Sequence, residues 1–168
     1  MDTYLAIASK RDQRQYADRE VPRESQDRIL DAGRIAGSAQ NKQPWRFLAI
    51  ESRDLLDRLA EVVFEPANLR SAGFAVAIVI RGTAALDGGR ALQNMVLAAW
   101  NDGITSCPNG IKNPEAVPDI LELEDDERVI NIPTFGYPVR DRDPESRTPE
   151  GWIGRAKRKP RDEVVERL

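Results

Sequence analysis

The sequence contains no histidine and a single cysteine, Cys107, in 168 residues. Without histidine the chain lacks the usual general base, the commonest metal ligand and any Ser-His or Cys-His nucleophile pair. One cysteine can form neither an internal disulfide framework nor a cysteine zinc cluster. We therefore expect no metal site, and if the protein is an enzyme, a bound cofactor carries its chemistry.

Long apolar runs are also missing. The longest cover residues 74–80 and 95–100, far short of the roughly 20 residues that a membrane-spanning helix needs. The chain begins Met1-Asp2, acidic where a signal peptide is basic, and no apolar segment follows. The net charge of −3 gives no reason to expect a nucleic acid or an anionic membrane as partner. We expect a cytoplasmic protein with neither kind of partner.

The composition that is present, 40% hydrophobic and 32% charged, suits one domain with a sizeable core over residues 1–168. Apolar spacing and capping residues predict helices at 4–9, from 21–22 to 37, at 53–63, at 87–101, and a short one from 113. Strands are predicted at 47–50, 74–80 and 129–135, the last interrupted near Pro133. This order of helices and few strands indicates an α+β fold.

The first polar segment that could carry chemistry contains Lys10, Arg11 and Arg14, three cations in five residues. They could hold a phosphate through charge-assisted hydrogen bonds. The alternative is a solvated charged turn, which charge alone favours because such runs are common on surfaces.

The second segment, residues 38–45, is dense in hydroxyl and amide groups and precedes a predicted strand. Such groups can pair with the edge of a polar heterocycle. Equally, the segment can be a loop closed by local side-chain-to-backbone bonds, with Trp45 as a core anchor.

Two further segments complete the set. Residues 107–110 form a turn whose backbone N–H groups could face a ligand, or a plain turn with a buried thiol. No activating base accompanies Cys107, so we do not expect it to be a nucleophile. Residues 155–160 are basic and could add phosphate contacts or form a solvated tail. The charged stretch 141–161 has little means of burying itself, and we expect it to wrap a partner subunit.

In this order the segments resemble the nitroreductase family of FMN (flavin mononucleotide) enzymes. The family opens with Arg-Arg-Ser-x-Arg-x-Phe/Tyr, and later carries Asn-x-Gln-Pro-Trp and Gln-Asn-Met. The matching segments here are residues 10–16 (KRDQRQY), 21–22 (VP), 36–45 (AGSAQNKQPW), 87–99 (DGGRALQNMVLAA), 136–138 (GYP) and 158–165 (RKPRDEVV).

The resemblance implies an α/β sandwich with a central, mostly antiparallel sheet flanked by helices, forming an intertwined homodimer with FMN at the interface. It implies an oxidoreductase that passes a hydride from NADH or NADPH through flavin N5 to a small organic acceptor, such as a nitro or quinone-like compound. Two alternatives stay open, a flavin-holding module without robust turnover and a structural homodimer whose site has decayed.

The resemblance also assigns residues. Lys10, Arg11 and Arg14 would approach the flavin phosphate and the pyrimidine edge. Ser38 and Asn41 would contact the flavin from the partner subunit, and Asn68 would make a polar contact to the ring.

The remaining assignments fall late in the chain. Pro108, Asn109 and Gly110 match the segment that passes over the reactive ring nitrogen. Arg158 matches a C-terminal phosphate ligand, with Arg155 or Lys157 as helpers. Since the flavin carries the chemistry, we expect no catalytic side chain, and Arg14 is expected to stabilise the charge of the reduced flavin.

Two departures from the family pattern have consequences. Asp12 stands in place of the usual serine, and since a carboxylate repels a phosphate, we expect it to brace Arg11 or Arg14. Residues 81–86 are all that separates the predicted strand 74–80 from the helix at 87, where many relatives insert a helical lid. The short connection implies a more open site.

Overall fold

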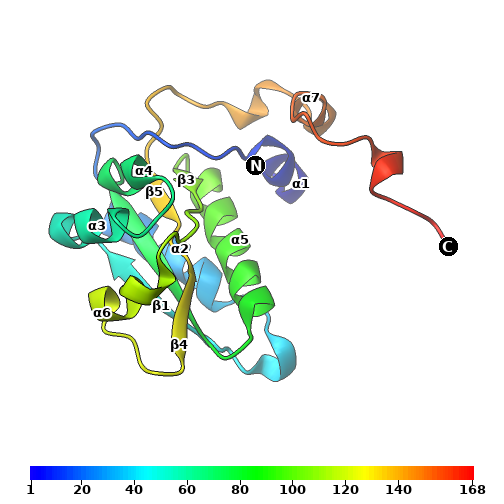
Figure 1. The fold of residues 1–168 in the computed structure, drawn as a ribbon. Coiled ribbons are helices and arrows are strands. Elements are labelled where there is room, and N and C mark those ends of the chain that lie inside the picture. The colour runs from blue at the N-terminus through cyan, green and yellow to red at the C-terminus, as the bar shows by residue number, and fades with distance from the viewer. The chain divides into compact units, whose positions relative to one another are not determined.

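The computed structural model describes residues 1–168 and divides into two compact units. One unit joins Met1–Lys10 to Asp143–Leu168, and the other is Arg11–Arg142. Figure 1 shows the larger unit as a sheet with helices on both faces. The expectation of one domain over the whole chain stays a prediction.

The sheet of the larger unit has five strands and is antiparallel throughout, as expected. Strand β2 (Phe74–Arg81) lies at its centre and pairs on one side with β1 (Trp45–Ile50). On its other side it pairs with both β4 (Glu127–Asn131) and β5 (Thr134–Gly136). Strand β3 (Thr105–Cys107) pairs with β5 at the far edge. The predicted strand 129–135 is thus two strands, and Pro133, which has no N–H to donate, lies in the break between them.

Alternate side chains of β2 enter two separate cores because successive residues of a strand point to opposite faces. Ala75 and Ala77 pack in the core that contains residues of α3 (Arg53–Ala60), α4 (Pro66–Arg70) and α6 (Val117–Leu121). Phe74, Val76 and Ile78 pack in the core that contains residues of α2 (Arg23–Arg34) and α5 (Ala85–Asn101). Covering both faces explains why β2 is apolar along its buried length.

The two helices α2 and α5 approach closely at Gly33. A Cβ atom there would collide with the side chain of Met95, which fills the space beside the glycine. The small residues predicted at the end of α2 therefore serve helix packing.

The smaller unit is built on α1 (Thr3–Ser9) and α7 (Pro149–Gly154), which contact each other. Asp2 caps α1 by accepting a 2.9 Å hydrogen bond from the Leu5 N–H, and Thr148 caps α7 through the Gly151 N–H at 3.3 Å. The Trp152 indole donates to the Pro144 carbonyl at 2.7 Å. Short 3₁₀ turns cover Pro144–Ser146 and Arg161–Glu163, and residues 157–168 are exposed.

Most predicted helices are present, with shifted ends. Helix α2 begins after Pro22, α3 ends at Ala60, and α5 begins at Ala85, so only residues 82–84 separate it from β2. The expected short connection is confirmed. The segment from Asn113 forms a 3₁₀ turn, Pro114–Ala116, followed by α6. Helix α4, strand β3 and helix α7 were not predicted from the sequence. No helix of the structure is both long and apolar enough to cross a membrane.

Candidate functional site

A cleft of about 440 Å³ lies between the segment at residues 13–15 and helix α4. This size is in the range of small-molecule pockets. Two of the predicted site residues, Arg14 and Asn68, line it although they are far apart in sequence. Its other lining residues are Gln13, Gln15, Glu65, Ala67 and Ser71.

The segment carrying Arg14 is anchored on both sides. The Gln13 N–H donates to the Ser106 carbonyl of β3 at 3.1 Å. The Tyr16 hydroxyl lies 2.8 Å from Thr134 Oγ1, and the Tyr16 ring packs against Gly136. Burial raises the pKa of Tyr16, the hydrogen bond to Thr134 opposing this only in part, so the hydroxyl stays neutral.

Between these anchors the Arg14 side chain is exposed and makes no ion pair or hydrogen bond within the protein. Asp12 therefore does not brace Arg14, which corrects one of the two roles expected for it. The backbone of Asp12 forms a parallel bridge with Ser106. The guanidinium of Arg14 keeps its full set of donors for a ligand in the cleft.

Asn68 and Asn109 are each only 3% exposed and are joined directly. Asn68 Nδ2 donates to Asn109 Oδ1 at 2.6 Å and lies 3.6 Å from Cys107 Sγ. Asn68 Oδ1 accepts no hydrogen bond within the protein. Because Asn68 lines the cleft, this oxygen can accept a hydrogen bond from a ligand there.

The polar atoms of the Asn109 side chain all form hydrogen bonds within the fold. Its Nδ2 group donates to the carbonyls of Cys107 and Ile132 at 3.0 and 2.8 Å, with Thr134 Oγ1 at 3.2 Å. Its backbone N–H donates to Asn131 Oδ1 at 3.0 Å. The polar groups of this side chain therefore all have protein partners, and the assignment of Asn109 to the segment that passes over the reactive ring nitrogen stays a prediction. The residue holds the 107–110 segment in place.

Pro108 and Gly110 flank Asn109 on the surface side. Pro108 is half-buried and Gly110 is exposed. A Cβ atom on Gly110 would lie 3.2 Å from the ring of Phe64, so the glycine allows that ring to lie against the backbone. Their assignment to a flavin-covering segment stays a prediction.

The loop before β1 contains Ser38 and Asn41. Ser38 Oγ accepts a 2.8 Å hydrogen bond from the Gln43 N–H, the local closure that the sequence had left as one alternative. Asn41 is exposed, and Gln40, Asn41 and Gln43 all have positive φ angles of 49° to 55°. Neither Ser38 nor Asn41 lines the Arg14 cleft of its own chain. Their predicted role from a partner subunit is untested.

The remaining predicted cations are divided between the units. Arg11 is half-buried at the start of the larger unit. Lys10 directly follows α1 and Arg155 directly follows α7, both in the smaller unit. The Arg158 guanidinium donates to the Ala156 carbonyl at 3.2 Å. Their phosphate contacts stay predictions.

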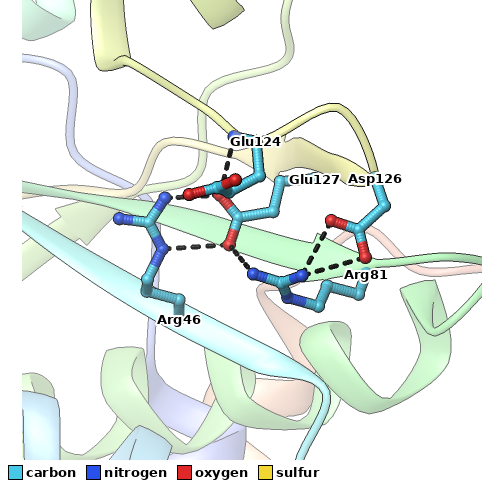
Figure 2. Close-up of polar contacts among 5 residues, drawn as sticks. All are labelled: Arg46, Arg81, Glu124, Asp126 and Glu127. Atoms are coloured by element: carbon cyan, nitrogen blue, oxygen red, sulfur yellow. Dashed lines mark hydrogen bonds and ion pairs between the residues drawn. The ribbon is translucent and has the colours of Figure 1, made fainter.

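A second polar cluster, which the sequence reading did not single out, lies where β1, β2 and β4 meet (Figure 2). The Glu127 side chain is 1% exposed and accepts hydrogen bonds from Arg46 at 3.1 and 2.5 Å and from Arg81 at 3.2 Å. Arg46 holds the pKa of Glu127 below its usual range, and Glu127 raises that of Arg46. Arg81 also pairs with Asp126 at 2.8 Å. Both oxygens of the buried Glu127 carboxylate accept hydrogen bonds from groups of the protein. The cluster therefore joins β1, β2 and β4.

The structure contains no group of three or more cysteine, aspartate or glutamate side chains placed to hold a metal ion.

Comparison with known proteins decides the family. The profile described as Nitroreductase family matches residues 7–81 and 77–137. A protein of Methanothermobacter thermautotrophicus, provisionally named an NADH dehydrogenase/NAD(P)H nitroreductase, is 30% identical over 152 residues, covering 84% of this chain and 80% of its own. The chain belongs to the nitroreductase family.

Solved structures of nitroreductases share the fold. A protein of Parabacteroides distasonis, with the same provisional name, superposes with a TM-score of 0.85 at 25% identity, covering 99% of this chain and 98% of its own. An FMN-dependent nitroreductase of Clostridium difficile superposes with a TM-score of 0.76 at 22% identity, over 82% of this chain and 88% of its own. The expected α/β sandwich is confirmed.

The cleft suits part of the flavin that this nitroreductase fold implies. A flavin pyrimidine edge offers carbonyl acceptors and one N–H donor. The cleft presents an unpaired guanidinium on Arg14 and an unpaired amide oxygen on Asn68, which are the complementary groups. Glu65 is the one carboxylate in the lining, and it would repel a phosphate there. The polar groups of the cleft therefore fit the ring edge better than the phosphate.

Proposed function

We propose that this protein is an FMN-dependent oxidoreductase that takes a hydride from NADH or NADPH and reduces a small organic acceptor, such as a nitro or quinone-like compound. Membership of the nitroreductase family supports the oxidoreductase class. The observation that carries the cofactor assignment is the meeting of unpaired Arg14 and Asn68 groups in one cleft.

The division of work between cofactor and protein follows from the side chains. When bound, FMN would itself accept the hydride and then donate it. Arg14 supplies a positive charge to a cofactor edge that becomes anionic on reduction, and such a preorganised charge stabilises reduction. Asn68 orients the ring by accepting a hydrogen bond, and its own orientation is fixed by Asn109. No histidine or activated cysteine is needed.

We propose further that the protein works as a cytoplasmic homodimer, with Ser38 and Asn41 reaching the partner's cofactor. Two observations support a second copy. The edge of β1 away from β2 has no strand partner, and large apolar side chains such as Ile35, Leu86 and Val164 are exposed. Exposed edges and apolar side chains of this kind are commonly covered by a partner.

The alternative is a flavin-holding module without robust turnover. The Glu65 carboxylate in the cleft and the connection of only residues 82–84, without a lid, favour it. Reduction of the bound cofactor by a nicotinamide decides between the two.

The test is an anaerobic titration of the purified protein with FMN, followed by mixing with NADH or NADPH in a stopped-flow instrument. We expect saturable FMN binding and bleaching of the flavin absorbance by one or both nicotinamides. Arg14→Ala should weaken FMN binding or slow reduction about tenfold or more, and Arg14→Lys should recover part of the loss. Arg58→Ala, an exposed arginine on α3, serves as the control.

Binding without bleaching would support the flavin-holding module. Absence of binding would overturn both functions, and an Arg14→Ala variant that matches the wild type would remove Arg14 from the site.

A further inference from the structure

Phe64 is a large aromatic side chain that the fold leaves 66% exposed. It follows α3, and the next residue, Glu65, lines the cleft that contains Arg14 and Asn68. None of the segments that match the family pattern includes it. A phenylalanine ring exposed to water forgoes the stabilisation that burial gives, so its presence next to a residue of the cleft wall calls for an explanation.

The backbone of Phe64 is held firmly. Its N–H donates to the Gly110 carbonyl at 3.1 Å, and the Val62 carbonyl accepts from the N–H groups of Lys112 and Asn113 at 2.8 and 3.1 Å. Val63 and Ile111 form an antiparallel bridge. The ring is therefore presented from a fixed backbone.

The Phe64 ring lies against the chain at Gly110. A Cβ atom on Gly110 would lie 3.2 and 3.6 Å from two carbons of the Phe64 ring, so any larger residue there would displace the ring. Gly110 belongs to the segment that the resemblance to the nitroreductase family predicts to lie over the reactive part of the cofactor. The Asn68–Asn109 hydrogen bond, 2.6 Å long, ties that segment to the cleft wall. Phe64 thus lies against the Pro108–Gly110 segment and directly precedes Glu65 of the cleft wall.

We propose that Phe64 is a specificity-determining residue whose exposed ring stacks on an aromatic electron acceptor at the mouth of the cleft. This inference rests on the proposed function. Pairs of aromatic rings attract each other beyond the effect of the area that they bury, so acceptors with a ring gain affinity over acceptors without one. A ring held on a fixed backbone suits this task because little conformational freedom is lost on binding. The connection at 82–84, too short for a lid, leaves Phe64 to define the acceptor.

The test compares a ring-bearing acceptor with one that has no ring. 4-Nitrobenzamide is neutral, so the Glu65 charge does not bias its binding, and ferricyanide has no ring to stack. In the FMN-loaded protein without nicotinamide, calorimetry gives the dissociation constant of 4-nitrobenzamide at equilibrium, with no turnover. Steady-state assays then give KM for both acceptors.

Phe64→Ala should raise the dissociation constant and KM for 4-nitrobenzamide about five- to twentyfold. The KM for ferricyanide, the affinity for FMN and the rate of reduction by nicotinamide should stay within twofold of the wild type. Phe64→Trp should keep 4-nitrobenzamide binding within about twofold, because it keeps a stacking ring. Val139→Ala, which shortens another exposed apolar side chain, is the matched control.

Unchanged 4-nitrobenzamide binding in Phe64→Ala would overturn the inference and leave the proposed function standing. So would an equal loss for ferricyanide, or a loss of the dimer in gel filtration, which would make Phe64 an interface residue. Failure of the wild type to bind FMN would overturn the proposed function and this inference together.

Discussion

Asn68 on α4 and Asn109 in the turn after β3 share a buried hydrogen bond of 2.6 Å that links the two walls of the candidate site. Asn109 also donates to two backbone carbonyls, so one side chain holds together the ends of β3 and β4 and the helix α4. The site is therefore built on a buried polar network, in which a half-satisfied member is costly.

The first prediction concerns that network. Asn109→Ala leaves the Ile132 carbonyl without a partner, and a buried unsatisfied group costs about 1–3 kcal/mol. It also removes one hydrogen bond from the Cys107 carbonyl, which keeps Thr134 Oγ1, and one from Asn68 Nδ2, which keeps Cys107 Sγ. We expect a loss of about 3 kcal/mol or more in the free energy of unfolding measured in urea. Asn101→Ala, at the exposed end of α5, should change it by about 0.5 kcal/mol or less. Equal stability of the two variants would mean that the network does not hold the site.

The second prediction concerns the loop before β1. Gln40 has φ 53° and ψ 23°, a left-handed conformation that costs an ordinary L-residue roughly 1–2 kcal/mol and glycine nothing. Gln40→Gly should therefore leave stability unchanged or raise it by about 1 kcal/mol. Lys42→Gly, two residues on at φ −68°, should lower it by about 0.5–1 kcal/mol because glycine only adds freedom to the unfolded chain. Thermal unfolding of both variants measures the contrast, and a stabilised Lys42→Gly would refute the assignment of strain to Gln40.

The third prediction concerns the contact between α2 and α5. Gly33→Val places new atoms where the Met95 side chain lies, and overpacking of this kind costs about 1–3 kcal/mol. Met95→Ala opens a cavity and costs about 2–5 kcal/mol alone. In the double variant the valine can occupy space vacated by the methionine, so the two losses should sum to more than the measured total. Strict additivity in urea unfolding would show that the two side chains do not compete.

Much of the fold follows from local signals in the sequence. The continuous apolar run at 74–80 predicts β2, and the near-complete apolar surface of residues 87–101 predicts a buried α5, because both elements are covered on more than one side. Ser52 caps α3 as expected, through a 3.4 Å hydrogen bond from the Leu55 N–H.

What the sequence reading missed are short elements whose structure depends on distant partners. β3 has three residues and exists through its pairing with β5, and α4 has five residues, of which Leu69 is buried in the core. Within the candidate site, the pattern pointed to Arg14 and Asn68 but could not show that Asn109 turns inward, since that depends on where the Ile132 and Thr134 acceptors lie. The pairing of Arg46 with Glu127 likewise joins residues that are 81 positions apart in the sequence.

The last prediction uses the pKa of Glu127, which the hydrogen bond from Arg46 lowers from its ordinary value of 4.5. A lowered pKa in the folded state means that the ionised carboxylate stabilises the fold at neutral pH. This stabilisation is lost as the pH falls below 4.5, toward the lower folded pKa.

Glu127→Gln should therefore be about 2 kcal/mol less stable than the wild type at pH 7, as charge-assisted hydrogen bonds are lost. The difference should shrink as the pH is lowered to about 3, because the wild-type carboxyl becomes protonated there. Glu61→Gln, which breaks an exposed ion pair with Arg70, should cost about 0.5 kcal/mol at most. Urea unfolding of the three proteins across this pH range is the measurement, and a stability gap for Glu127→Gln that does not change with pH would contradict the ionic role of the cluster.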